Sequence, residues 1–171
     1  MRYQVAYLNV YGNAKILADA IMDLLPSDST ECIDLSCQEL YDDADVYLMI
    51  FEMMRSAIPL DIMDALENLS GKSILCFAAC GSELWGDKEH IEQSMFPFLP
   101  DECDYRGLFV CPGHVPVNIL DSMQQSLQEQ PENSRAMAIL EDYRRSSGHP
   151  DAEDMNDLRR FISEHISLEE V

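Results

Sequence analysis

The chain has 171 residues, of which 11 are Lys or Arg and 32 are Asp or Glu, so its formal net charge is −21. This length predicts a single domain over residues 1–171 with a sizeable core. The charge argues against nucleic acid as a partner, because binding a phosphate backbone needs clustered cations. The acidic surface either steers the protein toward a basic protein partner or is simply solvated, without a partner.

The sequence also predicts where the protein is found. No apolar run approaches the ~20 residues of a membrane span, so no membrane partner is expected. The N-terminus passes directly into a strand pattern, without room for a signal peptide. We therefore expect a cytoplasmic protein whose six cysteines are reduced thiols. Their spacing fits no strong metal-ligand pattern, so no metal site is predicted.

Strand-like and helical patterns alternate along the first half of the chain. The predicted elements are a strand over Tyr3–Val10, a helix over Asn13–Leu25, a short strand over Glu31–Leu35, a strand over Asp45–Phe51 and a helix from Pro59 to Gly71. The strand Asp45–Phe51 is apolar enough to be buried on both faces, which is typical of parallel sheets.

The alternation continues and then gives way to helices. The predicted elements are a strand over Ser73–Ala79, a helix over Asp87–Phe96, a strand over Asp104–Cys111 and helices over Val117–Gln128, Arg135–Arg145 and Asp151–Ile166. Asp151 and Asp154 stand where a capping residue and its reciprocal acid belong. Five strands alternating with helices imply a three-layer α/β/α fold around a doubly wound, five-stranded parallel sheet. Such sheets bind ligands beyond the carboxyl ends of their strands.

The turn Asn9-Val10-Tyr11-Gly12-Asn13-Ala14 lies between the first strand and the first helix. The first N–H groups of a helix have no partner within it, so a tight glycine-containing turn at this point makes a cradle for an anion. We expect the phosphate of any phosphate-bearing cofactor to bind here. Gly12 either permits its close approach or is an ordinary turn glycine. The other loops at this edge are predicted at Glu52–Pro59, Cys80–Asp87 and Pro112–Pro116.

These loops resemble those of the flavodoxin family over nearly the whole chain. In that family the first turn reads Thr/Ser-x-Thr-Gly-Asn-Thr, and Gly12 and Asn13 match it. The run from Gly71-Lys72 to Gly81-Ser82 is similar to an apolar strand of that family and the flavin-side loop after it. Gly148-His149-Pro150-Asp151-x-x-Asp154 is similar to the start of its last helix. The resemblance implies the strand order 2-1-3-4-5 and FMN as the cofactor.

The first turn departs from the family pattern at three hydroxyl positions, which are here Asn9, Tyr11 and Ala14. The backbone N–H groups from Tyr11 to Lys15 need no particular side chain to bind phosphate, and Asn9 can donate through its amide. Lys15 is one of few cations near this edge and could partly replace the hydroxyls. Losing one phosphate hydrogen bond costs about 1–3 kcal/mol, which weakens FMN binding roughly ten- to hundredfold.

The resemblance places further flavin-binding candidates on two other loops. They are Met53, Met54 and Arg55 after the third strand, and Cys80, Gly81, Ser82 and Trp85 after the fourth. Trp85 either covers the flavin or folds back onto the rim of the sheet. His114 is either a proton donor near the pocket or a surface histidine.

The leading hypothesis is an FMN-binding electron-transfer protein that carries electrons to or within a cytoplasmic reductase system. Because the flavin does the chemistry, no catalytic residue is needed, and a redox carrier or flavoprotein subunit is favoured over a stand-alone enzyme. We expect a monomer or homodimer that docks to a basic redox partner. The alternative is a flavodoxin-like scaffold that has lost FMN and acts as an acidic protein-interaction subunit. A response-regulator receiver is rejected, because Cys111 stands where its lysine is required.

Overall fold

A five-stranded parallel sheet forms the centre of the computed structural model, which describes residues 1–53 and 57–166. Its strands are β1 (Tyr3–Tyr7), β2 (Thr30–Asp34), β3 (Val46–Met53), β4 (Ser73–Cys80) and β5 (Asp104–Pro112). They lie in the order β2-β1-β3-β4-β5, and all adjacent pairs are parallel. The doubly wound sheet and its order 2-1-3-4-5 are therefore confirmed.

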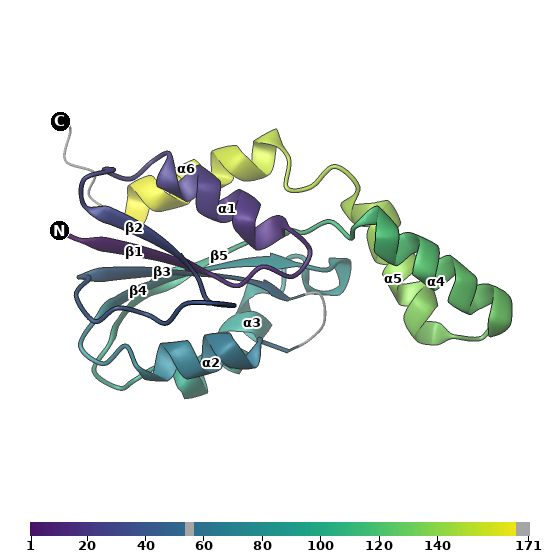
Figure 1. Ribbon diagram of the computed structural model, residues 1–171, viewed down its shortest axis with the longest axis horizontal. Coiled ribbons are helices and arrows are strands. Elements are labelled where there is room, and N and C mark those ends of the chain that lie inside the picture. Colours follow the sequence, from purple (N-terminus) through teal and green to yellow (C-terminus); the bar gives the residue numbers. More distant parts are fainter. Residues whose placement is uncertain (54–56, 167–171) are drawn as a thin grey trace.

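Helices cover both faces of the sheet and complete the three layers (Figure 1). One face carries α1 (Asn13–Met22) and α6 (Ala152–His165), and the other carries α2 (Leu60–Glu67) and α3 (Lys88–Met95). Residues 35–45 connect β2 to β3 through turns and irregular chain. Two 3-10 helices follow strand β4 and helix α3: η1 (Ser82–Leu84) and η2 (Phe96–Phe98).

Strand β3 shows how the sequence divides its side chains between the two faces. Successive strand residues point to opposite faces, and both faces are covered here, so an uninterrupted apolar run results. The residues that pack toward α1 and α6 are Val46, Leu48 and Ile50. Those that pack toward α2 and α3 are Tyr47, Met49, Phe51 and Met53. The same alternation directs Glu52, the only charged residue of β3, toward the face of α1.

A helical hairpin projects beyond the carboxyl side of the sheet (Figure 1). It consists of α4 (Val117–Glu129) and α5 (Ser134–Ser146). Helix α4 has no buried residue, whereas α5 buries Ala136 and Ser146. The hairpin is thus a largely self-contained addition whose second helix contacts η1. No helix in the described ranges is long and apolar enough to cross a membrane.

Element boundaries differ from the prediction by a few residues. Strand β1 ends at Tyr7, three residues before the predicted end, because the chain leaves the sheet once the Leu8 N–H has bonded to the Ile50 carbonyl at 2.9 Å. Strand β3 extends to Met53, so Glu52 belongs to a strand rather than to a loop. Helix α2 ends at Glu67, and turns connect it to Gly71.

Candidate anion-binding site at the carboxyl edge

The first loop follows β1 and leads into α1, where it meets the end of β3. Gly12 is the residue before the helix and has a φ of 100°, in the left-handed region that other residues rarely adopt. A Cβ added at this position would meet nothing within 4 Å. The turn conformation therefore requires glycine here, and no described residue approaches closely enough to need the missing side chain.

The carboxylate of Glu52 fills the cradle that this loop forms. Its Oε1 accepts hydrogen bonds from the N–H groups of Val10 (3.0 Å) and Ala14 (3.1 Å). Its Oε2 accepts from the N–H of Tyr11 (2.9 Å) and from Nδ2 of Asn13 (3.1 Å). The residue is only 4% exposed. Converging N–H groups and the N-terminal end of a helix dipole stabilise a buried anion, and here the anion belongs to the protein.

The two residues expected to replace the missing hydroxyls also have partners within the chain. Asn9 Oδ1 accepts from the Lys15 N–H at 3.2 Å and so caps another free donor of α1. The Lys15 ammonium forms an ion pair with Asp19, one turn further along the helix. The hydrogen bond from the Lys15 ammonium to the Asp19 carboxylate raises the pKa of Lys15. Its charge is therefore already paired along α1, on a side chain that is 47% exposed.

Asn13 connects the first loop to the loop after β5. It is fully buried, and besides Glu52 its Nδ2 donates to the His114 carbonyl at 3.0 Å. Its Oδ1 accepts from the His114 N–H at 2.9 Å. A Cβ added at Gly113 would lie 3.1 Å from Asn13 Nδ2, so glycine is needed there for close approach. The residue predicted from the family pattern is therefore a structural bridge between two loops.

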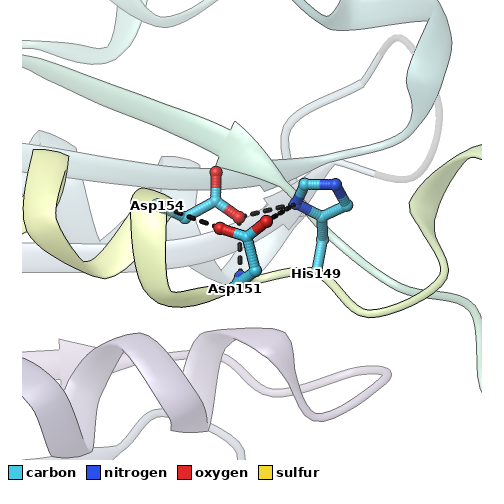
Figure 2. A group of neighbouring side chains, drawn as sticks. All are labelled: His149, Asp151 and Asp154. Atoms are coloured by element: carbon cyan, nitrogen blue, oxygen red, sulfur yellow. Dashed lines mark hydrogen bonds and ion pairs between the residues drawn. The ribbon is translucent and has the colours of Figure 1, made fainter.

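A chain of hydrogen bonds continues from His114 to the start of α6. His114 Nδ1 donates to the His149 carbonyl at 3.1 Å, and His149 Nδ1 donates to Asp154 Oδ2 at 2.7 Å (Figure 2). These partners accept only, which places the proton on each Nδ1. His114 thus uses this nitrogen to join two loops.

The acids beside His149 form the predicted capping box (Figure 2). Asp151 Oδ1 accepts from the N–H of Asp154 at 3.0 Å, and Asp154 Oδ2 accepts from the N–H of Asp151 at 2.7 Å. The backbone N–H of Asp154 holds the pKa of Asp151 below its usual range. Ligand atoms of His149, Asp151 and Asp154 lie within 4.8 Å of one another, but helix capping accounts for this arrangement.

The second loop, after β4, is held by another carboxylate of the chain. Asp142 of α5 accepts from the N–H of Ser82 at 2.9 Å and from its hydroxyl. The N–H of Gly81 donates to the Met53 carbonyl at 3.0 Å, so the loops after β3 and β4 begin side by side. This confirms their expected proximity and leaves their flavin-binding role a prediction.

Trp85 lies against the rim of the sheet and the hairpin. Its indole N–H donates to the carbonyl of Cys80 at 3.0 Å. The ring lies 5.9 Å from the imidazole of His149, and the guanidinium of Arg145 is 5.1 Å from its centroid. The indole thus lies on the rim of the sheet in the described structure, and its role in covering a flavin stays a prediction.

Of the first-loop candidates, the structure brings Tyr11, Asn13 and Ala14 onto Glu52. Asn9 and Lys15 bond to each other instead. Met54 and Arg55 lie outside the described residues. Sequence reasoning did not predict the roles of Val10, Glu52 and Asp142. One signal was available for Glu52: it is the single charge in an otherwise apolar strand, at a position whose alternation points to α1. The role of Asp142 has no such signal, because it depends on how the hairpin packs.

A five-stranded sheet of order 2-1-3-4-5 with an anion cradle after its first strand is the architecture of flavodoxin-type α/β proteins. A profile of the flavodoxin domain matches residues 4–163, so the chain belongs to this family. The flavodoxin-like domain-containing protein BilS of Clostridioides difficile (strain CD3) is 23% identical over 167 residues, covering 94% of each chain. BilS of Clostridium symbiosum (strain WAL-14163) is 21% identical over 182 residues, covering 95% of this chain and 94% of the relative.

Solved structures support the same fold. The flavodoxin of Streptococcus pneumoniae TIGR4 superposes with a TM-score of 0.59 at 13% identity. A short-chain flavodoxin associated with a bacterial microcompartment also gives 0.59, at 14% identity. Each comparison covers 98% of both chains. At this identity the likeness extends to the fold only.

Proposed function

We propose that the chain is a flavodoxin-type electron-transfer protein that uses FMN. The observation that carries this proposal is the cradle after β1, which binds a carboxylate through three backbone N–H groups and one side-chain amide. A carboxylate in this position is a stand-in for the phosphate, and the donor set suits a phosphate equally well. Membership of the flavodoxin domain family supports the same assignment.

The residues that would hold FMN come from the two neighbouring loops. The backbone of residues 10–14 and the Asn13 amide would hold the phosphate. The described candidates on the ring side are the end of β3 at Met53 and the loop from Cys80 to Trp85, where the side chains of Met53 and Cys80 are buried in the core, so these two residues would contribute through their backbone. FMN when bound supplies the one- or two-electron chemistry, and the chain supplies binding, orientation and electrostatic field.

A titration of the purified protein with FMN tests this proposal. We expect FMN fluorescence to be quenched on binding and the melting temperature to rise, because a ligand that binds only the folded state stabilises it. Riboflavin, which has the same ring without the phosphate, should be titrated in parallel. If neither flavin changes fluorescence or melting temperature, the proposed function is wrong.

The charge of the chain suggests the kind of partner. A formal charge of −21 favours docking to a basic redox protein through contacts that weaken as salt increases. A cytoplasmic location and a monomeric or homodimeric state belong to the same proposal.

One observation favours a second function. Because Glu52 already satisfies the cradle, the protein can fold with its first loop closed and no cofactor present. The chain would then act as an acidic interaction subunit of a larger redox system. Absence of flavin binding together with stable binding to a basic redox protein would select this alternative.

A further inference from the structure

We propose that Glu52 is a built-in competitor of the flavin phosphate, so that this residue determines how much a phosphate group adds to ligand affinity. The proposal rests on the proposed function for its flavin arm only. The ligand class concerned is a phosphate monoester or free phosphate, whose oxygens need the donors that Glu52 holds.

The position of Glu52 makes it part of the fold and not a loosely attached side chain. It pairs in register with Ala79 of the neighbouring strand β4, and its side chain is directed toward the start of α1. It is 4% exposed and satisfies four donors from one short segment. Nothing outside the chain is needed to close the cradle.

Phosphate and the carboxylate cannot occupy the cradle together. Both would need the N–H groups of Val10, Tyr11 and Ala14, and two anions in contact in a buried site repel each other strongly. Phosphate binding is therefore an exchange in which four hydrogen bonds to Glu52 are broken before new ones form. The phosphate of FMN should consequently add little to the affinity that the ring provides.

Removing the carboxylate should convert the closed cradle into an open anion site. In Glu52→Ala the four donors lose their acceptor, and an anion from solution is the available replacement. In Glu52→Gln the side chain keeps its size, but one acceptor oxygen becomes an amide donor and the charge is lost. Glu52→Gln preserves the packing of the side chain. It therefore still tests the proposal if Glu52→Ala does not fold.

The first experiment measures melting temperature against sodium phosphate, with sodium chloride at equal ionic strength as the reference. Glu83→Gln is the matched control, because Glu83 is an exposed acid on η1 near the same edge. We expect a phosphate-specific rise in Glu52→Gln and Glu52→Ala, and none in the wild type or in Glu83→Gln. An equal phosphate response in wild type and Glu52→Gln would overturn the proposal.

The second experiment compares FMN with riboflavin. We expect similar affinities in the wild type and a preference for FMN of about tenfold or more in Glu52→Gln, on the scale of one charged hydrogen bond. A strong FMN preference in the wild type that is unchanged in Glu52→Gln would contradict the competition. If no variant binds either flavin, the proposed function fails, while the phosphate response still decides the role of Glu52.

Discussion

The loops after β1 and β4 are both closed by a carboxylate of the chain, but the two carboxylates come from different parts of the molecule. Glu52 lies in the central strand β3, is 4% exposed and accepts four hydrogen bonds. Asp142 lies on the projecting hairpin, is only half-buried and contacts Ser82 through one oxygen. The first loop is therefore held by a residue of the central sheet, and the second loop by a residue of the α4–α5 hairpin.

The Glu52 contacts help to hold the fold together, whereas the Asp142 contact affects only the edge of the sheet beside the hairpin. The Glu52 contacts continue through Asn13 to His114 and then to the start of α6. A change in the first loop should therefore be felt across the carboxyl edge. The Asp142 contact ends at the hairpin, so a change there should remain local.

The largest expected effect comes from Asn13→Ala. The substitution removes three hydrogen bonds, one of them buried and two part-buried, and leaves the N–H and carbonyl of His114 without their partner. We expect the free energy of unfolding to fall by about 2–4 kcal/mol, since each buried group left unsatisfied costs about 1–3 kcal/mol. Urea denaturation measures this change.

Asn9→Ala provides the matched control for that variant. Asn9 is in the same loop, but it is exposed and accepts a single hydrogen bond, from the Lys15 N–H. Its loss should cost about 0.5–1 kcal/mol. Equal costs for the two asparagines would show that Asn13 does not connect the loops as the structure indicates.

A smaller effect is expected from Asp142→Ala at the second loop. The variant removes two hydrogen bonds to Ser82 at a half-buried site, so we expect a loss of about 1–2 kcal/mol in the free energy of unfolding. Glu141→Ala is the control, because Glu141 is exposed and pairs only with Arg144 among its described contacts. If Asp142→Ala lowered the free energy of unfolding as much as Asn13→Ala, the hairpin contact would matter to the fold as much as the contacts of the first loop, which would contradict this comparison.

The sequence predicts the sheet and its edge well, because these depend on local patterns. The alternation along β3 and the glycine at position 12 follow from strand periodicity and turn conformation. The Asp151 capping box is local too, since its two acids are three residues apart. Each of these features can be deduced from a short stretch of chain.

The contacts that close the loops are different, because they join segments far apart in sequence. Glu52 lies about 40 residues from its donors, and Asp142 lies 60 residues from Ser82. Asn13 and His114 are separated by 101 residues. The family pattern identifies Asn13 as important, but only the packed structure shows that it bonds to a carboxylate and to a second loop.

The smallest effect of Asp142→Ala is expected on the reactivity of the Cys80 thiol. Cys80 ends β4 directly before the second loop. It is fully buried, and burial raises the pKa of its thiol to about 12, so about one in ten thousand molecules would carry the thiolate at pH 8. Iodoacetamide at that pH should label the exposed Cys37 readily and leave Cys80 unlabelled, as peptide mapping by mass spectrometry can show. We expect the same protection in Asp142→Ala, because strands β3 and β5 flank Cys80 whether or not the hairpin contact is made. Rapid labelling of Cys80 in that variant would mean that the hairpin closes the sheet edge itself, and the second loop would then depend on the fold as strongly as the first.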